Sequence, residues 1–157
     1  MQSVFQKGST LDVYIPASKK GMVIEEKRPQ QKISTGRETI LLVDDEKSNI
    51  TVTKEILESL GYRVMIAVSG QEAVALYTEK GNEIDLIILD LIMPGIGGGK
   101  AFDILRKIDP SVRVILSSGY SVDGEAMQIL ERGCNGFIQK PFRIADIAQK
   151  IRDALEK

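Results

Sequence analysis

Residues 85–90 read Asp-Leu-Ile-Ile-Leu-Asp, a short apolar run that leads into a loop rich in glycine and proline at 91–99. A run of this length that is apolar at consecutive positions is typical of a strand buried on both faces. A second run of the same kind, Thr-Ile-Leu-Leu-Val at 39–43, ends on Asp44 and Asp45. Runs of this kind predict a parallel sheet that is covered by helices on both faces.

Three more strands and five helices are predicted around these two runs. The strands are predicted at residues 62–67, 113–117 and 136–140. Apolar residues at helical spacing fill the intervals, and a capping box from Ser69 to Glu72 begins the second helix. The predicted helices cover residues 50–60, 69–80, 100–108, 123–132 and 144–155. Strands and helices that alternate in this way predict an α/β fold.

The composition excludes several classes of function. The chain has 157 residues with 21 Lys and Arg against 22 Asp and Glu, so its net charge of -1 argues against a general nucleic-acid or membrane-surface binder. It has no histidine, which excludes a histidine-based triad, a histidine-ligated metal and a phosphohistidine within this chain. No apolar run is long enough to span a membrane. The single cysteine, Cys134, cannot form a disulfide within the chain, so we expect a reducing, cytoplasmic location.

The first 37 residues differ from the rest of the chain. Residues 11–15 alternate between apolar and polar side chains and end at Pro16, a pattern that predicts one short strand. Residues 17–37 are polar and lack periodicity, so we interpret them as a linker. Because a lone strand is not stable by itself, the N-terminal piece either docks on something or is the remnant of a neighbouring domain.

Side chains that suit phosphoryl chemistry stand where the predicted strands end. Asp44 and Asp45 follow the first strand, Asp90 ends the third and Lys140 ends the fifth. In a doubly wound sheet these ends meet at one edge, where functional crevices form. Three carboxylates repel one another, and a divalent cation such as Mg²⁺ relieves that repulsion. The formal charges of the cation, the lysine and the carboxylates then sum to zero, and Asp90 can act as an in-line nucleophile towards a phosphoryl group.

Two serines, Ser117 and Ser118, end the fourth strand and compete for one role, a hydroxyl that hydrogen-bonds a phosphoryl oxygen. We favour Ser118 because the small residue Gly119 follows it. A backbone carbonyl just after Asp90 can complete the shell of oxygen ligands around the metal.

Over residues 39–157 the sequence resembles a response-regulator receiver domain of two-component signalling. The motifs that support the resemblance are ILLVDDE at 40–46, LIILDLIMPGIGG at 86–98, VILSSGY at 114–120 and GFIQKPF at 136–142. The resemblance implies a flavodoxin-like (βα)5 fold, which is a doubly wound parallel five-stranded sheet in the order 2-1-3-4-5 with helices on both faces. It also implies that the receiver domain occupies residues 38–157.

The resemblance assigns roles to the residues at the strand ends. Asp90 would be the residue that is phosphorylated by a phosphohistidine. Asp45 would bind Mg²⁺ directly and Asp44 largely through water, with Asp90 and the main-chain carbonyl of Ile92 as further ligands.

The same resemblance implies a catalytic pair and a conformational switch. Ser118 and Lys140 match the family's hydroxyl and lysine positions, and the Lys140–Pro141 peptide bond would be cis. Phe137 matches an aromatic switch position, and Tyr120 is a second switch candidate. The surface of the fourth helix, fifth strand and fifth helix would shift on phosphorylation to control partner contact or onward relay.

A second resemblance concerns the N-terminus. The stretch GSTLDVYIPAS at 8–18 resembles the end of a histidine kinase ATP-binding domain. Residues 1–16 would then be the remnant of that domain, and the receiver would belong to a hybrid sensor kinase. The chain lacks the ATP-binding boxes and the phosphorylated histidine, so we do not expect it to be a kinase itself.

Partners follow from these resemblances. The implied partners are a sensor histidine kinase core, in cis or in trans, a histidine phosphotransfer domain and a second receiver, with no nucleic acid and no membrane. Because the sequence ends at Lys157, directly after the last predicted helix, we expect the signal to leave by protein contact.

The sequence departs from the usual pattern next to the acceptor. Apolar Ile92 lies two residues after Asp90 and bulky Tyr120 two after Ser118. In the family these side chains border the route of the attacking water, so we predict a phosphoryl group that persists. One alternative is a non-phosphorylated interaction module of the same fold. Another is a phosphohydrolase with an aspartate nucleophile, although such enzymes typically place an acid where Ile92 stands.

Overall fold

The computed structural model describes residues 2–4, 8–10, 14, 34–119 and 124–156. By its contacts the chain divides into two compact units, Met1–Gln31 and Lys32–Lys157. In the first unit, β1 (Gln2–Val4) pairs antiparallel with β2 (Gly8–Thr10). Of the strand that the sequence predicts at 11–15, only Tyr14 is described, and it belongs to no strand. Most of the predicted linker at 17–37 lies outside the described residues.

The second unit is built on a sheet of five parallel strands. The strand order is β4-β3-β5-β6-β7, which is the predicted order 2-1-3-4-5 counted from the first strand of this unit. The strands are β3 (Thr39–Val43), β4 (Arg63–Ala67), β5 (Leu86–Asp90), β6 (Val114–Ser118) and β7 (Gly136–Gln139). The prediction of a doubly wound parallel sheet is therefore confirmed.

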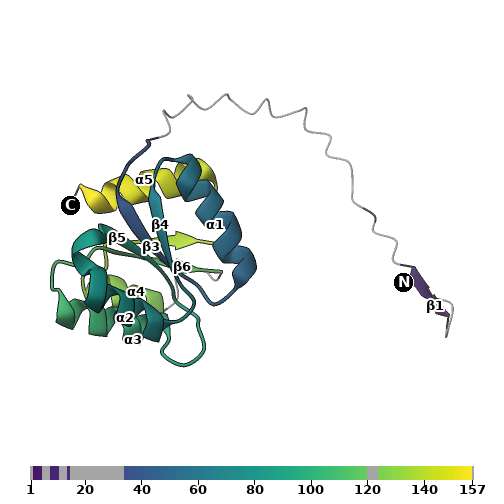
Figure 1. Ribbon diagram of the computed structural model, residues 1–157. Coiled ribbons are helices and arrows are strands. Elements are labelled where there is room, and N and C mark those ends of the chain that lie inside the picture. Colours follow the sequence, from purple (N-terminus) through teal and green to yellow (C-terminus); the bar gives the residue numbers. More distant parts are fainter. Residues whose placement is uncertain (1, 5–7, 11–13, 15–33, 120–123, 157) are drawn as a thin grey trace. The chain divides into compact units, whose positions relative to one another are not determined.

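Four α-helices connect these strands and a fifth follows the last strand, and together they cover both faces of the sheet. The helices are α1 (Lys47–Ser59), α2 (Gly70–Lys80), α3 (Gly98–Ile108), α4 (Gly124–Glu131) and α5 (Ile144–Leu155), and a short 3-10 turn, η1 (Gly81–Glu83), follows α2. In Figure 1, α1 and α5 lie on one face of the sheet and α2, α3 and α4 on the other. The described part of the chain contains no helix that is long and apolar enough to cross a membrane.

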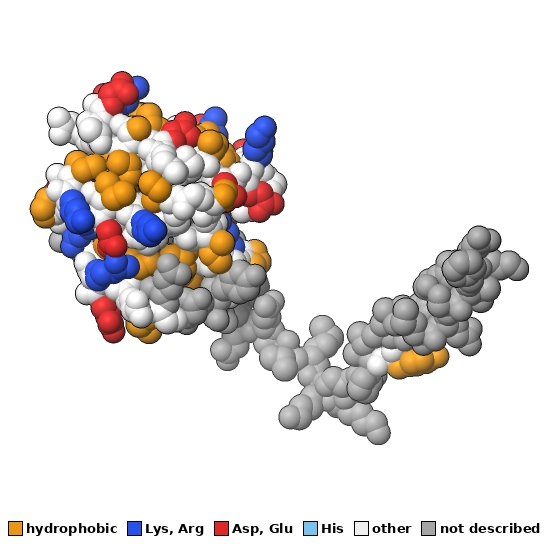
Figure 2. Space-filling view, turned by 90° about the horizontal axis from the view of Figure 1, so that it is seen from below, with side chains coloured by type: hydrophobic (Ala, Val, Ile, Leu, Met, Phe, Trp, Pro, Cys, Tyr) orange, Lys and Arg blue, Asp and Glu red, His pale blue; other side chains and the backbone are white. Residues whose placement is uncertain are grey.

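The alternation of side chains along each strand divides the hydrophobic core into two layers. Leu41 and Leu89 pack with α2, α3 and α4, whereas Leu42 and Ile88 pack with α1 and α5. All five residues of β5 are buried, as expected for a central strand covered on both faces. On the outside of the α2–α3–α4 layer, charged side chains of both signs surround small groups of hydrophobic side chains (Figure 2).

Local features of the sequence fix where the helices begin. Ser69 caps α2, because its hydroxyl accepts a hydrogen bond from the Glu72 amide at 3.2 Å. The predicted cap by Ser69 is confirmed, but the Glu72 carboxylate accepts from the Val68 amide at 2.8 Å, one residue before the N-cap residue that a capping box engages. Helix α3 begins at Gly98, two residues before the predicted start.

Candidate functional site

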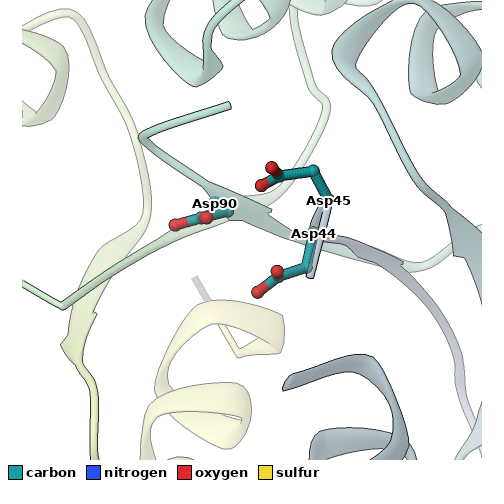
Figure 3. A group of neighbouring side chains, drawn as sticks. All are labelled: Asp44, Asp45 and Asp90. Carbon is teal, nitrogen blue, oxygen red and sulfur yellow. The ribbon is translucent and has the colours of Figure 1, made fainter. Parts of the chain in front are cut away.

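Three aspartates meet at the carboxyl end of the sheet. Asp44 and Asp45 follow β3 directly, and Asp90 is the last residue of β5. Because β3 and β5 are neighbours in register, with Val43 opposite Leu89, their ends lie side by side. One carboxylate oxygen of each aspartate lies within 4.8 Å of the other two. Figure 3 shows the three carboxylates pointing towards the same side.

Lys140 brings a positive charge to these carboxylates from the end of β7. Its ammonium nitrogen lies 2.5 Å from Asp44 Oδ2 and 3.3 Å from Asp90 Oδ1. The peptide bond between Lys140 and Pro141 is cis, as predicted. The sequence prediction that Asp44, Asp45, Asp90 and Lys140 converge agrees with these distances.

Burial makes the charges of this site costly. Asp44 is 3% exposed and Asp90 8%, whereas Asp45 is exposed to solvent. Burial raises the pKa of Asp90, and the negative charge of Asp44 raises it further. The Lys140 ammonium and a hydrogen bond from the Ile92 amide lower that pKa without cancelling the rise. A divalent cation at this point would relieve the same repulsion.

The donor set fits a hard cation. The three carboxylates offer only oxygen, which is the ligand type that Mg²⁺ prefers. One oxygen of Asp44 is occupied by Lys140, so this carboxylate is less available than that of solvent-exposed Asp45. Counting formal charges, three carboxylates and one ammonium leave a deficit of two positive charges, which one Mg²⁺ would supply.

Of the other predicted site residues, the structure describes Ser117, Ser118, Phe137 and Ile92. Ser117 and Ser118 are both buried at the end of β6. Strand alternation places Ser117 on the same face as Asp90, its partner in the pairing of β5 with β6. It places Ser118 on the same face as Phe137, which is half-buried against the α2–α3–α4 layer. The Ile92 side chain is 57% exposed, and Tyr120 lies outside the described residues.

Sequence reasoning missed two features next to the pocket. Asn49, in the first turn of α1, donates hydrogen bonds to both Asp44 and Glu46. A groove of about 460 Å³ opens beside Lys140, between α1 and the start of α5. Val52, Ile56 and Phe142 form its apolar side. The VxxxI spacing of the two α1 residues indicated an apolar stripe, but not that part of it stays uncovered.

Comparison with known proteins agrees with this geometry. The sequence model of the response regulator receiver domain matches residues 40–152. The chain belongs to this family. The receiver domain is a signalling domain of two-component systems, so the resemblance seen in the sequence is confirmed.

Similar proteins include both kinases and regulators. The sensor kinase CckA of Brucella abortus is 33% identical over 164 residues, which cover 96% of this chain and 17% of that protein. The transcriptional regulatory protein YvrH of Bacillus subtilis is 34% identical over 120 residues, covering 76% of this chain and 49% of that protein. The chain thus spans half or less of the length of these two relatives.

Solved structures share the fold. A response regulator receiver domain protein from Clostridium thermocellum is 30% identical, with a TM-score of 0.73 over 76% of this chain and 94% of that one. The receiver domain of a sensor histidine kinase from Pseudomonas aeruginosa is 28% identical, with a TM-score of 0.70 over 78% of this chain and all of that one. The latter structure has a magnesium ion coordinated in its active-site cleft.

Proposed function

We propose that this receiver domain accepts a phosphoryl group on Asp90 from a phosphohistidine of a sensor kinase, in a reaction that requires Mg²⁺. The observation that supports this most directly is the convergence of Asp44, Asp45 and Asp90 with the Lys140 ammonium at the carboxyl end of the sheet. We assign Asp45, Asp90 and the carbonyl of Ile92 as direct metal ligands, with Asp44 acting largely through water.

The proposed transfer is a displacement at phosphorus. A carboxylate oxygen of Asp90 attacks, and the bond between phosphorus and the imidazole nitrogen of the donor breaks. The imidazole keeps the electron pair of that bond and takes up a proton. Lys140, already 3.3 Å from Asp90, neutralises charge on a phosphoryl oxygen, and Ser118 donates a hydrogen bond to another. Bound Mg²⁺ would supply further neutralisation of the phosphoryl charge.

Phosphorylation of Asp90 would thereby produce the output signal of the domain. We assign Phe137 as the switch residue, because it shares a sheet face with Ser118 and is only half-buried. A movement of Ser118 towards the phosphoryl group would leave space that this ring can enter. The surface of α4, β7 and α5 would change as a result, and this chain would act as a signalling domain rather than as an enzyme with turnover.

One relative, the sensor kinase, supports a hybrid kinase as the parent protein. The match to the sensor kinase covers 96% of this chain, whereas the receiver match spans residues 40–152. Since 4% of 157 residues is about six residues, the kinase match reaches well into residues 1–37. We therefore assign residues 1–16 to the end of a kinase ATP-binding domain, 17–37 to a linker and 38–157 to the receiver.

Intact-mass measurement tests the proposed phosphorylation. With Mg²⁺ and acetyl phosphate, we expect the wild-type chain to gain one phosphate, roughly 80 Da, as an aspartyl phosphate. Asp90→Ala should gain none, while Asp153→Ala, on the exposed side of α5, should react as the wild type does. The same mass shift with a phosphorylated histidine kinase core as the donor would identify a partner.

A folded wild-type chain that gains no phosphate from either donor would contradict the proposal. It would favour a non-phosphorylated interaction module of the same fold, and failure to bind Mg²⁺ would support that alternative. Continuous turnover of small phosphate esters would instead indicate a phosphohydrolase.

A further inference from the structure

Asn49 links two carboxylates at the edge of the acidic pocket. Its side-chain amide nitrogen lies 3.3 Å from Asp44 Oδ1 and 3.1 Å from Glu46 Oε2. Asn49 lies in the first turn of α1, whereas Asp44 and Glu46 lie in the loop between β3 and that helix. One neutral donor group therefore stands between two negative charges.

The contact with Asn49 completes the set of donors around Asp44. Asp44 Oδ1 also accepts from the Glu46 amide at 2.9 Å, and Oδ2 faces the Lys140 ammonium at 2.5 Å. A carboxyl group that is only 3% exposed needs hydrogen-bond partners, because a buried polar group without them is costly. Donors on both oxygens fix the plane of the carboxylate. Rotation of Asp44 towards a metal ion would break the contacts with Asn49 and Lys140.

Glu46 is held from the other side. Its Oε1 accepts from the Ser48 hydroxyl at 2.7 Å, and its Oε2 accepts from Asn49. Without the amide of Asn49 between them, the Asp44 and Glu46 carboxylates would face one another with like charges. By contrast, no hydrogen bond or ion pair within residues 34–119 and 124–156 engages Asp45, which is free to approach a cation.

We propose that Asn49 is a positioning residue for the phosphorylation of Asp90. It holds Asp44 in the orientation that faces Lys140 and the water shell of the cation, and it leaves direct ligation to Asp45 and Asp90. This inference rests on the proposed function, because it needs a cation in the pocket. It assigns a specific role to a polar side chain on α1 that does not touch the phosphoryl group.

Metal binding in the absence of phosphate tests the inference. Mn²⁺ is a suitable probe, because it takes the same oxygen ligands as Mg²⁺ and its free fraction is measured by electron paramagnetic resonance. We expect Asn49→Ala and the similarly sized Asn49→Leu to bind Mn²⁺ roughly tenfold more weakly, which is the usual effect of removing an outer-shell partner. Asn82→Ala, in the exposed turn η1, is the matched control and should bind as the wild type does.

A double-mutant cycle separates positioning from a general structural effect. If Asn49 acts through Asp44, then Asn49→Ala should cause no further loss of Mn²⁺ affinity when Asp44 is already alanine. Equal losses in both backgrounds, or wild-type Mn²⁺ affinity in both Asn49 variants, would overturn the inference. Thermal unfolding of each variant shows that the binding data refer to folded protein.

The two proposals fail in different ways. A wild-type chain that gains phosphate on Asp90, together with Asn49 variants of unchanged Mn²⁺ affinity, would overturn only the role of Asn49. A folded wild-type chain that binds no Mn²⁺ would overturn the role of Asn49 and remove the metal-dependent part of the proposed function as well.

Discussion

Asp90 stands in a pocket where three carboxylates lie close to one another. The Asp90 side chain is buried next to Asp44, and the Lys140 ammonium forms an ion pair with both carboxylates. If Asp90 accepts a phosphoryl group as proposed, the Lys140 ammonium is already in place to neutralise part of the incoming charge.

Ile92 is the side chain that we expect to control the lifetime of the phosphoryl group. It lies two residues after Asp90, its amide hydrogen-bonds the Asp90 carboxylate, and its 57% exposed side chain offers water no hydrogen bond. We predict that Ile92→Asn speeds the loss of phosphate about tenfold, which corresponds to about 1.4 kcal/mol of barrier. Intact mass, followed over time after removal of acetyl phosphate, gives the rate.

The control for Ile92→Asn is Ile108→Asn, which makes the same change at an exposed isoleucine at the end of α3. It should leave the rate of phosphate loss unchanged. Loss of phosphate from the wild-type chain within seconds would show that Ile92 does not shield the acyl phosphate from water.

The first residue of helix α3, Gly98, packs closely against the backbone at the end of β5, the strand that contains Asp90. The Gly98 amide donates to the Leu91 carbonyl at 3.0 Å, so the loop between β5 and α3 closes on itself. A Cβ atom at Gly98 would lie 2.3 Å from the Asp90 carbonyl oxygen, far inside contact distance. The chain approaches itself this closely only because the residue is glycine.

Because of this close contact, we predict that Gly98→Ala destabilises the fold by about 1 to 3 kcal/mol, the usual range for overpacking a tight site. It should also slow phosphorylation, because the backbone of Asp90 must move. Gly97→Ala is the matched control, since a Cβ there would meet its nearest atom at 3.7 Å and the backbone φ of -62° suits alanine. Chemical unfolding of both variants measures the difference, and equal stabilities would refute the packing argument.

The elements of the receiver were predictable from sequence, whereas the first unit was not. The strands β3, β5 and β6 each contain a run of at least three apolar residues, and polar residues stand at or directly after their carboxyl ends, which locates both the sheet and its candidate functional edge. Strand β2 reads Gly-Ser-Thr and has no apolar alternation, so its pairing with β1 left no pattern to detect.

The candidate site was predictable in its charges but not in its details. The sequence predicts that Asp44, Asp90 and Lys140 lie close together, because all three stand at strand ends and parallel strands share one carboxyl edge. The role of Asn49 was not predicted, because a polar residue in the first turn of a helix is typical of a solvent-exposed position. Its bonds to Asp44 depend on how α1 packs over the sheet, which no local pattern reveals.

On the scale of the whole domain, helix α5 contacts the segment that leads into β3. Arg152, near the end of α5, lies 2.6 Å from Glu38, the residue before β3, and its guanidinium stands 5.6 Å from the centre of the Tyr62 ring. The Gly36 amide donates to the Leu60 carbonyl, so the last residues of the predicted linker already contact the domain. Helix α5 therefore begins close to Lys140 of the site and, near its other end, contacts the segment that precedes β3.

The ion pair between Glu38 and Arg152 gives this connection a pH dependence. Burial raises the pKa of Glu38, but the hydrogen bond and charge of Arg152 and the nearby backbone amides outweigh burial and hold it below its ordinary value of 4.5. A carboxyl whose pKa is lower in the folded state stabilises the fold when ionised. That contribution is complete above pH 4.5 and is lost as the pH falls through the lower, folded pKa.

We therefore predict that Glu38→Gln lowers the free energy of unfolding by roughly 1 kcal/mol at neutral pH, a modest value because the Glu38 side chain is 30% exposed. The difference between wild type and variant should shrink as the pH is lowered below 4.5, because the wild-type carboxyl then becomes neutral too. Urea unfolding at a series of pH values measures it. Glu83→Gln, in the exposed turn η1, controls for the loss of one charge. A difference that stays constant down to acidic pH would mean that Glu38 contributes through packing and not through its pair with Arg152.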